Sequence, residues 1–280
     1  MIHFRTEKVT DRITRIYAVC TELCYLVEGD DRAALIDTGS GFGSLRAAVE
    51  QLTDKPLIVL LTHGHTDHAM GSGEFTDRPV YLSHEDRYIY LPHGDDDFRH
   101  QGMALAEEGV TVTEEDYIPT APFSLFRDLR EGDRFDLGGE TVAVYALPGH
   151  TKGSLVMLME NARILLLGDA CNGFTFLYDT YSLSVAHYEE HLRRVRAALD
   201  GKYDRILASH GNGELPIDVM DSCIQVCEDI KAGRTDDLPL EFRGTKGLIA
   251  KTMGPNGRLD GSSGNIVYSK AQIWQDGSLC

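Results

Sequence analysis

Apolar and polar positions in the N-terminal third of the chain predict three short strands, a helix and a fourth strand. The expected first three strands cover residues 13–19, 24–28 and 33–36. The next segment places apolar residues on one helical face, at Leu45, Ala48, Val49 and Leu52. Pro56 ends this helix, and the unbroken apolar run Leu57–Leu61 predicts a strand that is buried on both faces.

A similar succession of elements recurs in the second half of the chain. A buried strand over residues 164–167 ends at Gly168-Asp169, and a strand over residues 205–208 ends at Ser209-His210. The amphipathic helix expected between them carries Tyr188, Leu192, Val195 and Leu199 on one face. The order strand, aspartate, helix, strand, histidine therefore occurs twice. We expect two related halves of one α/β domain, with polar residues at the ends of the strands, where open sheets place their sites.

The remaining segments carry less regular patterns. Residues 84–130 are irregular and charged, which is typical of a lid-like insertion; its His93 and His100 are expected in a solvated loop, or at a pocket mouth. The tail is rich in glycine and predicts short strands rather than helices. We therefore expect one domain over residues 1–240 and a strand-rich C-terminal extension over residues 241–280.

Charge and composition exclude several classes of protein. The 280 residues include 27 Lys and Arg against 44 Asp and Glu, a formal net charge of −17, which disfavours binding to nucleic acid or to an anionic membrane. No apolar run approaches the roughly 20 residues of a membrane-spanning helix. The N-terminal residues show no secretory signal pattern, and the six cysteines are too sparse for a disulfide framework. We expect a cytoplasmic protein with a small-molecule substrate, and leave open a homo-oligomer.

The segment His63-Gly64-His65-Thr66-Asp67-His68 carries the strongest chemical signal. Three imidazoles and a carboxylate directly after a buried strand are not explained by packing, because burying them without partners costs several kcal/mol. Imidazole together with carboxylate suits Zn²⁺ best, and also Fe²⁺ or Mn²⁺. Residues two apart on a loop can share a side, so His63 and His65 are expected to bind one ion while Asp67 and His68 face a second.

Three other predicted strand ends supply further metal-ligating side chains. They are His150 after the alternating strand 141–146, Asp169 after the strand 164–167, and His210 after the strand 205–208. Each has a glycine beside it, which allows the backbone to turn sharply and approach an ion closely.

Taken in order, these segments resemble the metallo-β-lactamase-fold hydrolases over roughly residues 12–230. The matching segments are Leu35-Ile36-Asp37-Thr38-Gly39, Thr62 to His68, Pro148-Gly149-His150-Thr151, Gly168-Asp169 and Ser209-His210-Gly211. The resemblance implies a four-layer αβ/βα sandwich with two metal ions at one edge. It also implies that His63, His65 and His150 bind the first ion, that Asp67, His68 and His210 bind the second, and that Asp169 bridges them.

Three differences from the better-known branches of this family indicate which branch the chain is most similar to. Asp169 stands where the zinc β-lactamases carry a cysteine, and His65 stands where the oxygen-reducing diiron flavoproteins carry a glutamate. The acidic charge opposes the nucleic-acid-processing branch. The pattern is most similar to the glyoxalase II and lactonase group, although the tail lacks the helical character that binds glutathione in glyoxalase II.

The mechanism expected from this resemblance is hydrolysis of a small ester, thioester or lactone by a hydroxide shared between the two ions. Asp67 binds metal and could orient the nucleophile, and Asp37 is expected to hold the His63 loop by hydrogen bonds, or to serve as a turn carboxylate. Tyr178 and Tyr181 are candidates for touching the substrate oxygen, with core packing as the alternative. Two other functions stay open: a phosphodiesterase of small molecules or nucleotides, and a non-catalytic metal-binding sensor.

Overall fold

The computed structural model describes residues 2–255 and 257–277, and the chain forms two compact units. Unit 1 comprises Met1–Val144, Met159–Ala162 and Ser209–Gly213, and unit 2 comprises Tyr145–Leu158, Arg163–Ala208 and Glu214–Cys280. The division at residue 240 stays a prediction.

Unit 1 is built on a seven-stranded sheet whose strands follow one another in chain order. The strands are β1 (Arg5–Lys8), β2 (Ile13–Tyr17), β3 (Leu23–Glu28), β4 (Ala33–Ile36), β5 (Leu57–Leu60), β6 (Val80–Leu82) and β7 (Arg127–Asp128). The pairings from β1 to β4 are antiparallel, and those from β4 to β7 are parallel. Parallel strands need crossover connections, and α1 (Leu45–Leu52) supplies the one between β4 and β5.

Short helices fill the other connections of unit 1. They are α2 (Thr66–Ala69), α3 (Arg87–His93), α4 (Asp96–Gly102) and the 3₁₀ turns η1 (Met70–Phe75), η2 (His84–Asp86), η3 (Met103–Leu105), η4 (Glu114–Asp116) and η5 (Phe123–Leu125). The strand β8 (Arg134–Asp136) pairs antiparallel with the start of β9 (Thr141–Ala146). The segment 84–130, expected to be irregular, thus contains α3 and α4 as well as loops.

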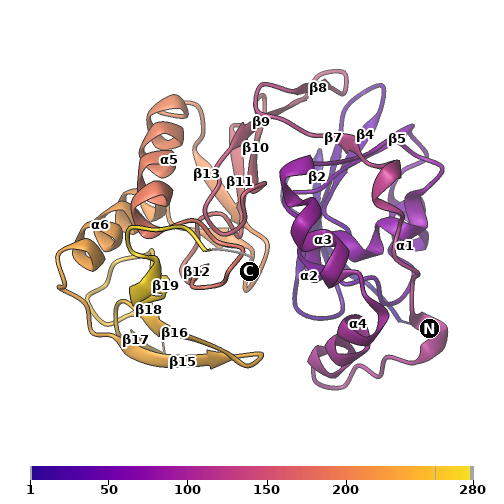
Figure 1. Ribbon diagram of the computed structural model, residues 1–280. Helices are drawn as coiled ribbons and strands as arrows, with labels where there is room; N and C mark the ends of the chain where they lie inside the picture. The colour runs from indigo at the N-terminus through magenta and orange to yellow at the C-terminus, as the bar shows by residue number, and fades with distance from the viewer. Residues whose placement is uncertain (1, 256, 278–280) are drawn as a thin grey trace. The chain divides into compact units, whose positions relative to one another are not determined.

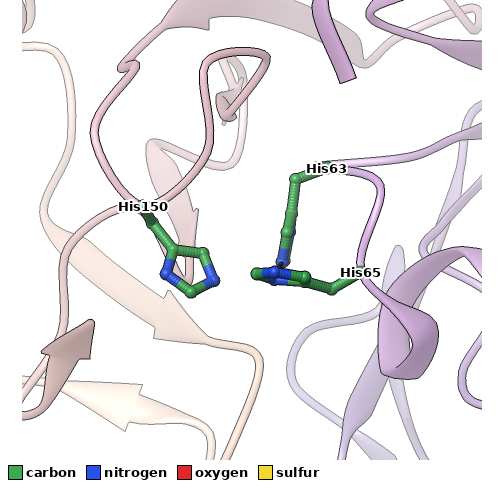
Figure 2. Close-up of side chains that lie close together, drawn as sticks. All are labelled: His63, His65 and His150. Atoms are coloured by element: carbon green, nitrogen blue, oxygen red, sulfur yellow. Dashed lines mark hydrogen bonds between the residues drawn. The ribbon is translucent and has the colours of Figure 1, made fainter. Parts of the chain in front are cut away.

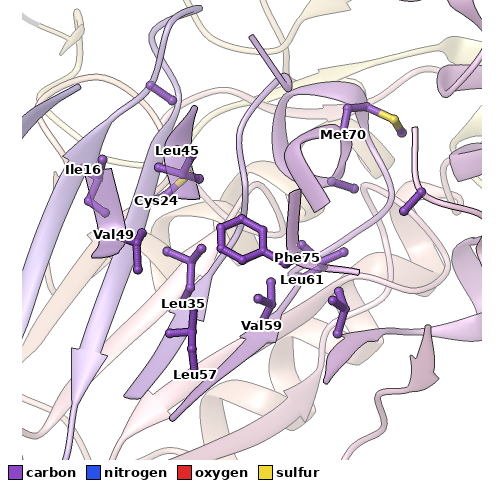
Figure 3. Packing of buried hydrophobic residues seen from close by; sticks show 14 of the residues in the cluster. Ile16, Cys24, Leu35, Leu45, Val49, Leu57, Val59, Leu61, Met70 and Phe75 are labelled. Carbon is purple, nitrogen blue, oxygen red and sulfur yellow. The ribbon is translucent and has the colours of Figure 1, made fainter. Parts of the chain in front are cut away.

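The core of unit 1 lies between its sheet and α1 (Figure 3). Leu35 of β4 and Val59 of β5 are fully buried in one cluster with Leu45 and Val49 of α1. The hydroxyl of Ser44 accepts a hydrogen bond from the Ala47 amide and caps the helix. This packing fixes the carboxyl ends of β4 and β5, where Asp37 and the histidine segment begin.

Unit 2 has a second parallel pair of strands, as the repeated pattern predicts. Strand β11 (Ile164–Gly168) lies between β10 (Leu155–Met159) and β13 (Arg205–Ala208), and β13 also pairs with β14 (Glu214–Leu215). The β11 and β13 strands are parallel. The helices α5 (Val185–Ala198) and α6 (Val219–Lys231) pack side by side in this unit (Figure 1). An ion pair between Arg193 and Glu228 joins them on the solvent side.

The C-terminal part of unit 2 forms a separate four-stranded sheet in the order β12–β19–β16–β15. Its strands are β12 (Thr175–Leu177), β19 (Ile266–Tyr268), β16 (Thr245–Ile249) and β15 (Leu238–Phe242). A two-stranded ribbon of β17 (Met253–Gly254) and β18 (Gly257–Arg258) and the turn η6 (Lys270–Gln272) complete the tail. Strand β12 separates Asp169 from α5, which the sequence pattern did not predict.

The mixed α/β class with several sheets is confirmed. Strands expected over residues 33–36, 141–146 and 205–208 have those bounds. The sequence pattern missed β1, whose four residues are all exposed, because an edge strand without an apolar face gives no periodic signal.

No described helix is long and apolar enough to cross a membrane. Among the described cysteines, Cys24, Cys171, Cys223 and Cys227 are buried free thiols, as expected for small apolar residues.

Candidate metal centre

His63 and His65 lie on the loop between β5 and α2 in unit 1, and their ring nitrogens face each other (Figure 2). Nε2 of His63 is 2.9 Å from Nδ1 of His65. Two nitrogens bound to one tetrahedral ion at about 2.0–2.1 Å are about 3.3 Å apart, so these two are nearly positioned to share an ion. His63 is buried, whereas His65 is partly exposed.

A hydrogen-bond chain from Asp37 sets which nitrogen of each histidine faces the site. The Thr62 hydroxyl donates to Oδ2 of Asp37 at 2.8 Å and lies 3.1 Å from Nδ1 of His63. Nδ1 of His68 lies 2.8 Å from Oδ2 of Asp37. An ionised carboxylate only accepts, so His68 carries its proton on Nδ1, and its Nε2 keeps the lone pair that a metal ion needs.

A second group of ligand atoms lies beside the first in unit 1. Oδ2 of Asp67 is 3.6 Å from Nε2 of His68 and 3.4 Å from Nε2 of His210. The side chain of His68 is 1% exposed, against 38% for Asp67 and 35% for His210. One carboxylate with two imidazoles, half open to solvent, is a donor set suited to a catalytic divalent ion that keeps room for water or substrate.

Unit 2 holds the other two predicted ligands, His150 and Asp169, after β9 and β11. Nε2 of His150 lies 3.9 Å from Oδ2 of Asp169. Nδ1 of His150 donates to the Phe176 carbonyl at 3.0 Å, which leaves its Nε2 with the lone pair (Figure 2 draws the His150 ring on its loop). Gly149 is required beside it, because a Cβ there would lie 2.1 Å from the ring of Tyr188. Both side chains are mostly buried.

The donor sets therefore fit a divalent metal ion on their chemistry. Every imidazole with an assigned tautomer presents an unprotonated nitrogen, and each group includes only the nitrogen and oxygen donors that Zn²⁺, Fe²⁺ and Mn²⁺ accept. Oδ1 of Asp37 accepts from the Thr62 amide at 2.7 Å, which places this carboxylate beside the His63 loop.

Two buried acids that support this region were missed by the sequence reasoning. Oδ2 of Asp86 accepts from the Gly64 amide at 2.8 Å, between the two histidines. Glu22 accepts from the amides of Cys20 and Ser40, each at 2.7 Å. Burial, and then the nearby Asp67, raises the pKa of the Glu22 carboxyl. Neither acid belongs to a sequence motif: Asp86 binds the Gly64 amide, and Glu22 binds the amides of Cys20 and Ser40 and also the Ser40 hydroxyl, at 2.8 Å.

His93 stacks between two other rings, a contact that its sequence context did not predict. Its ring stacks on His65 with centroids 5.0 Å apart and planes at 22°, and on Phe98 at 4.5 Å. The His93 ring therefore packs against the predicted ligand His65 instead of lying in a solvated loop. His100 behaves as a surface residue: its Nε2 is 3.1 Å from the exposed Glu114.

Tyr178 and Tyr181 lie in unit 2, after β12. Tyr178 is 7% exposed, and burial raises the pKa of its hydroxyl to about 12. Burial also raises the pKa of Tyr181, which is partly exposed and whose amide donates to Asp179. Contact of either hydroxyl with a substrate stays a prediction.

The chain belongs to the metallo-beta-lactamase superfamily, whose family model matches residues 17–210, more than half of its length. It is 34% identical over 148 residues to an uncharacterized protein of Mycobacterium tuberculosis, covering 50% of this chain and 61% of that one, less than two thirds of the relative's length. It is 28% identical over 215 residues to the acyl-coenzyme A thioesterase MBLAC2 of Bos taurus, covering 67% of this chain and 72% of the relative.

A solved structure shows the same fold at low identity. The metallo-beta-lactamase FIM-1 of Pseudomonas aeruginosa, in its mono-zinc form, superposes with a TM-score of 0.59 at 17% identity, over 81% of this chain and 96% of that one. The superfamily and the histidine and aspartate clusters together indicate divalent metal binding.

Proposed function

We propose that the protein is a metal-dependent hydrolase that cleaves a small-molecule ester, thioester or lactone with two divalent ions, most readily Zn²⁺. In this proposal His63, His65 and His150 would hold one ion, Asp67, His68 and His210 would hold the other, and Asp169 would contribute to both. The observation that carries it is the Asp37 network, because one buried carboxylate orients both His63, through Thr62, and His68. A network of this kind is expected where imidazoles must present fixed lone pairs.

Bound ions of this kind lower the pKa of a water molecule to near neutrality and polarise a carbonyl. Hydrolysis would add one water molecule across the acyl C–S or C–O bond and would release a carboxylic acid together with a thiol or an alcohol. Asp67 is partly exposed and can accept a hydrogen bond from the attacking water, which orients it. The buried Asp37 stays with Thr62 and His68 and acts only by positioning.

Two further observations support the ester or thioester class within a diverse superfamily. One relative is named an acyl-coenzyme A thioesterase, and the matched region includes most of this chain. The bridging position carries Asp169 rather than the cysteine of the zinc β-lactamases, which favours the glyoxalase II and lactonase-like branch. The formal charge of −17 favours a small-molecule substrate over nucleic acid.

The test is a substrate panel with the metal-loaded protein. We expect hydrolysis of chromogenic carboxyl esters, thioesters or lactones, and loss of that activity after chelation and its return with Zn²⁺, Mn²⁺ or Fe²⁺. Hydrolysis of phosphodiesters alone would instead assign the protein to that class. Metal binding without turnover of any of these substrates would favour a sensor.

A further inference from the structure

Four aromatic side chains of unit 2 form an aromatic cluster, defined here as Phe174, Phe176, Tyr178 and Phe242. The first three are alternate residues along and beside β12, so they share one face of the strand. The Phe176 ring lies at the centre, with ring centroids 5.7 Å from Phe174, 5.4 Å from Tyr178 and 5.9 Å from Phe242. The interplanar angles lie between 50° and 78°, typical of edge-on aromatic packing.

A hairpin of the tail brings Phe242 to this cluster. Arg243 and Gly244, at φ of 50° and 80°, form the two-residue turn between β15 and β16. Only Leu248 and Ile249 of β16 pair with β19, so the end of the hairpin extends past β19. Gly247 makes close packing there feasible, because a Cβ would lie 2.9 Å from Cγ of Tyr178.

The aromatic cluster is only half covered. Phe242 is 43% exposed and Phe174 and Phe176 are partly exposed, whereas Tyr178 beneath them is buried. Grouped, partly exposed rings on a defined platform are typical of a surface that binds an apolar group.

The backbone joins the aromatic cluster directly to a proposed metal ligand. The Phe176 carbonyl accepts the hydrogen bond from Nδ1 of His150, and Nε2 of the same ring points to Asp169. One residue therefore places an aromatic ring in the cluster and orients a ligand for the reaction. The aromatic cluster and these two proposed ligands therefore belong to the same part of unit 2.

From this connection we infer that the aromatic cluster binds the apolar acyl chain of the substrate and makes the enzyme selective for longer acyl groups. The inference rests on the proposed ester or thioester hydrolysis. An aliphatic chain fits this surface because the rings offer no charge and few hydrogen-bonding atoms. Each methylene removed from water on the rings favours binding by about fourfold.

The experiment compares chain lengths with the metal-loaded protein. The substrates are p-nitrophenyl esters from acetate to decanoate, and the readout is the ratio of kcat/KM for decanoate to that for acetate. We expect the native protein to prefer decanoate. Phe242→Ser should lower the ratio about tenfold, through KM, and Phe242→Leu should keep most of it. Leu259→Ala, which removes a 71% exposed side chain of the same unit, is the matched control and should leave the ratio unchanged.

An unchanged ratio in Phe242→Ser, or a native preference for acetate, would overturn the inference. If Phe242→Ser instead turned a dimer into a monomer at an unchanged ratio, the cluster would be assigned to contact with a second copy. Complete inability of the native protein to hydrolyse esters and thioesters would refute the proposed function separately. In that event, binding of a fluorescent fatty acid that is lost in Phe242→Ser still supports the apolar site, and absence of binding overturns it.

Discussion

Nδ1 of the buried His68 lies 2.8 Å from Oδ2 of Asp37, and the same carboxylate accepts hydrogen bonds from the amide and hydroxyl of Thr62. Asp37 itself has a left-handed backbone, at φ of 61°. A residue other than glycine is uncommon there, and aspartate tolerates it better than most. The backbone at the end of β4 thus places the Asp37 carboxylate where it binds both Thr62 and His68 of the candidate metal centre.

Asp37→Asn should weaken metal binding by about 10- to 100-fold. The amide can no longer accept from both Thr62 and the protonated Nδ1 of His68, so the His68 ring loses its fixed tautomer. Chelator competition with Zn²⁺ measures the change. Asp77→Asn removes an exposed carboxylate of the same unit, paired with Arg46, and is the control. Equal affinities in the native protein and Asp37→Asn would contradict the positioning role.

His93→Ala should reduce Zn²⁺ affinity about three- to tenfold, because the His65 ring loses the ring stacked on it. His93→Phe should keep most of the affinity, since a phenyl ring can still stack between His65 and Phe98. The comparison separates stacking from direct ligation by the imidazole. If His93→Phe binds Zn²⁺ as weakly as His93→Ala, then the imidazole itself acts and the stacking account is wrong.

Arg99→Met should lower the free energy of unfolding by about 3 kcal/mol. The fully buried guanidinium donates to the carbonyls of Ile118, Ser40 and Gly41, and the shortest of these bonds is 2.6 Å. Burial lowers the pKa of the Arg99 guanidinium, and the hydrogen bonds to these carbonyls stabilise the buried charge. Denaturant unfolding gives the value. Arg130→Met, at a 76% exposed side chain, should change stability by less than about 0.5 kcal/mol.

Asp237→Asn should destabilise the protein at neutral pH and have little effect in acid. Hydrogen bonds from Lys270, Thr235 and Tyr268 lower the pKa of Asp237 to about 2. A depressed folded-state pKa adds stability above the unfolded value of 3.8, and that stability is lost as pH falls toward 2. We expect a difference of about 1 kcal/mol at pH 7, since the site is partly solvated. Urea unfolding at pH 7 and pH 2 tests it; a difference that stays constant with pH would contradict this origin.

Sequence reasoning singled out the candidate ligands but missed the residues that support them, and the reason is physical. His63, His65, Asp67 and His68 lie in one short segment after an apolar strand, so their spacing is visible in one dimension. Asp86 and His93 act on the same loop from elsewhere in unit 1, through the Gly64 amide and through stacking on the His65 ring, and Glu22 binds the Ser40 amide in the segment after β4. Such contacts depend on how the chain folds back, and they have no periodic or motif signal.

A similar limit applies to the strands. Apolar runs identified β4, β5 and β11, because a strand that is buried on both faces consists almost entirely of apolar residues. Strand β12 was missed because its three residues lie between turns and its partner, β19, is far along the chain. The aromatic cluster that β12 carries became evident only with the tail hairpin in place.

The most direct test of the central claim measures metal content and hydrolysis on the same preparations. The native protein should bind two divalent ions per chain and hydrolyse an ester or thioester. His65→Ala and Asp169→Ala should each lose metal and activity together, while circular dichroism shows that the fold persists. Full activity with two bound ions in either variant would contradict the account.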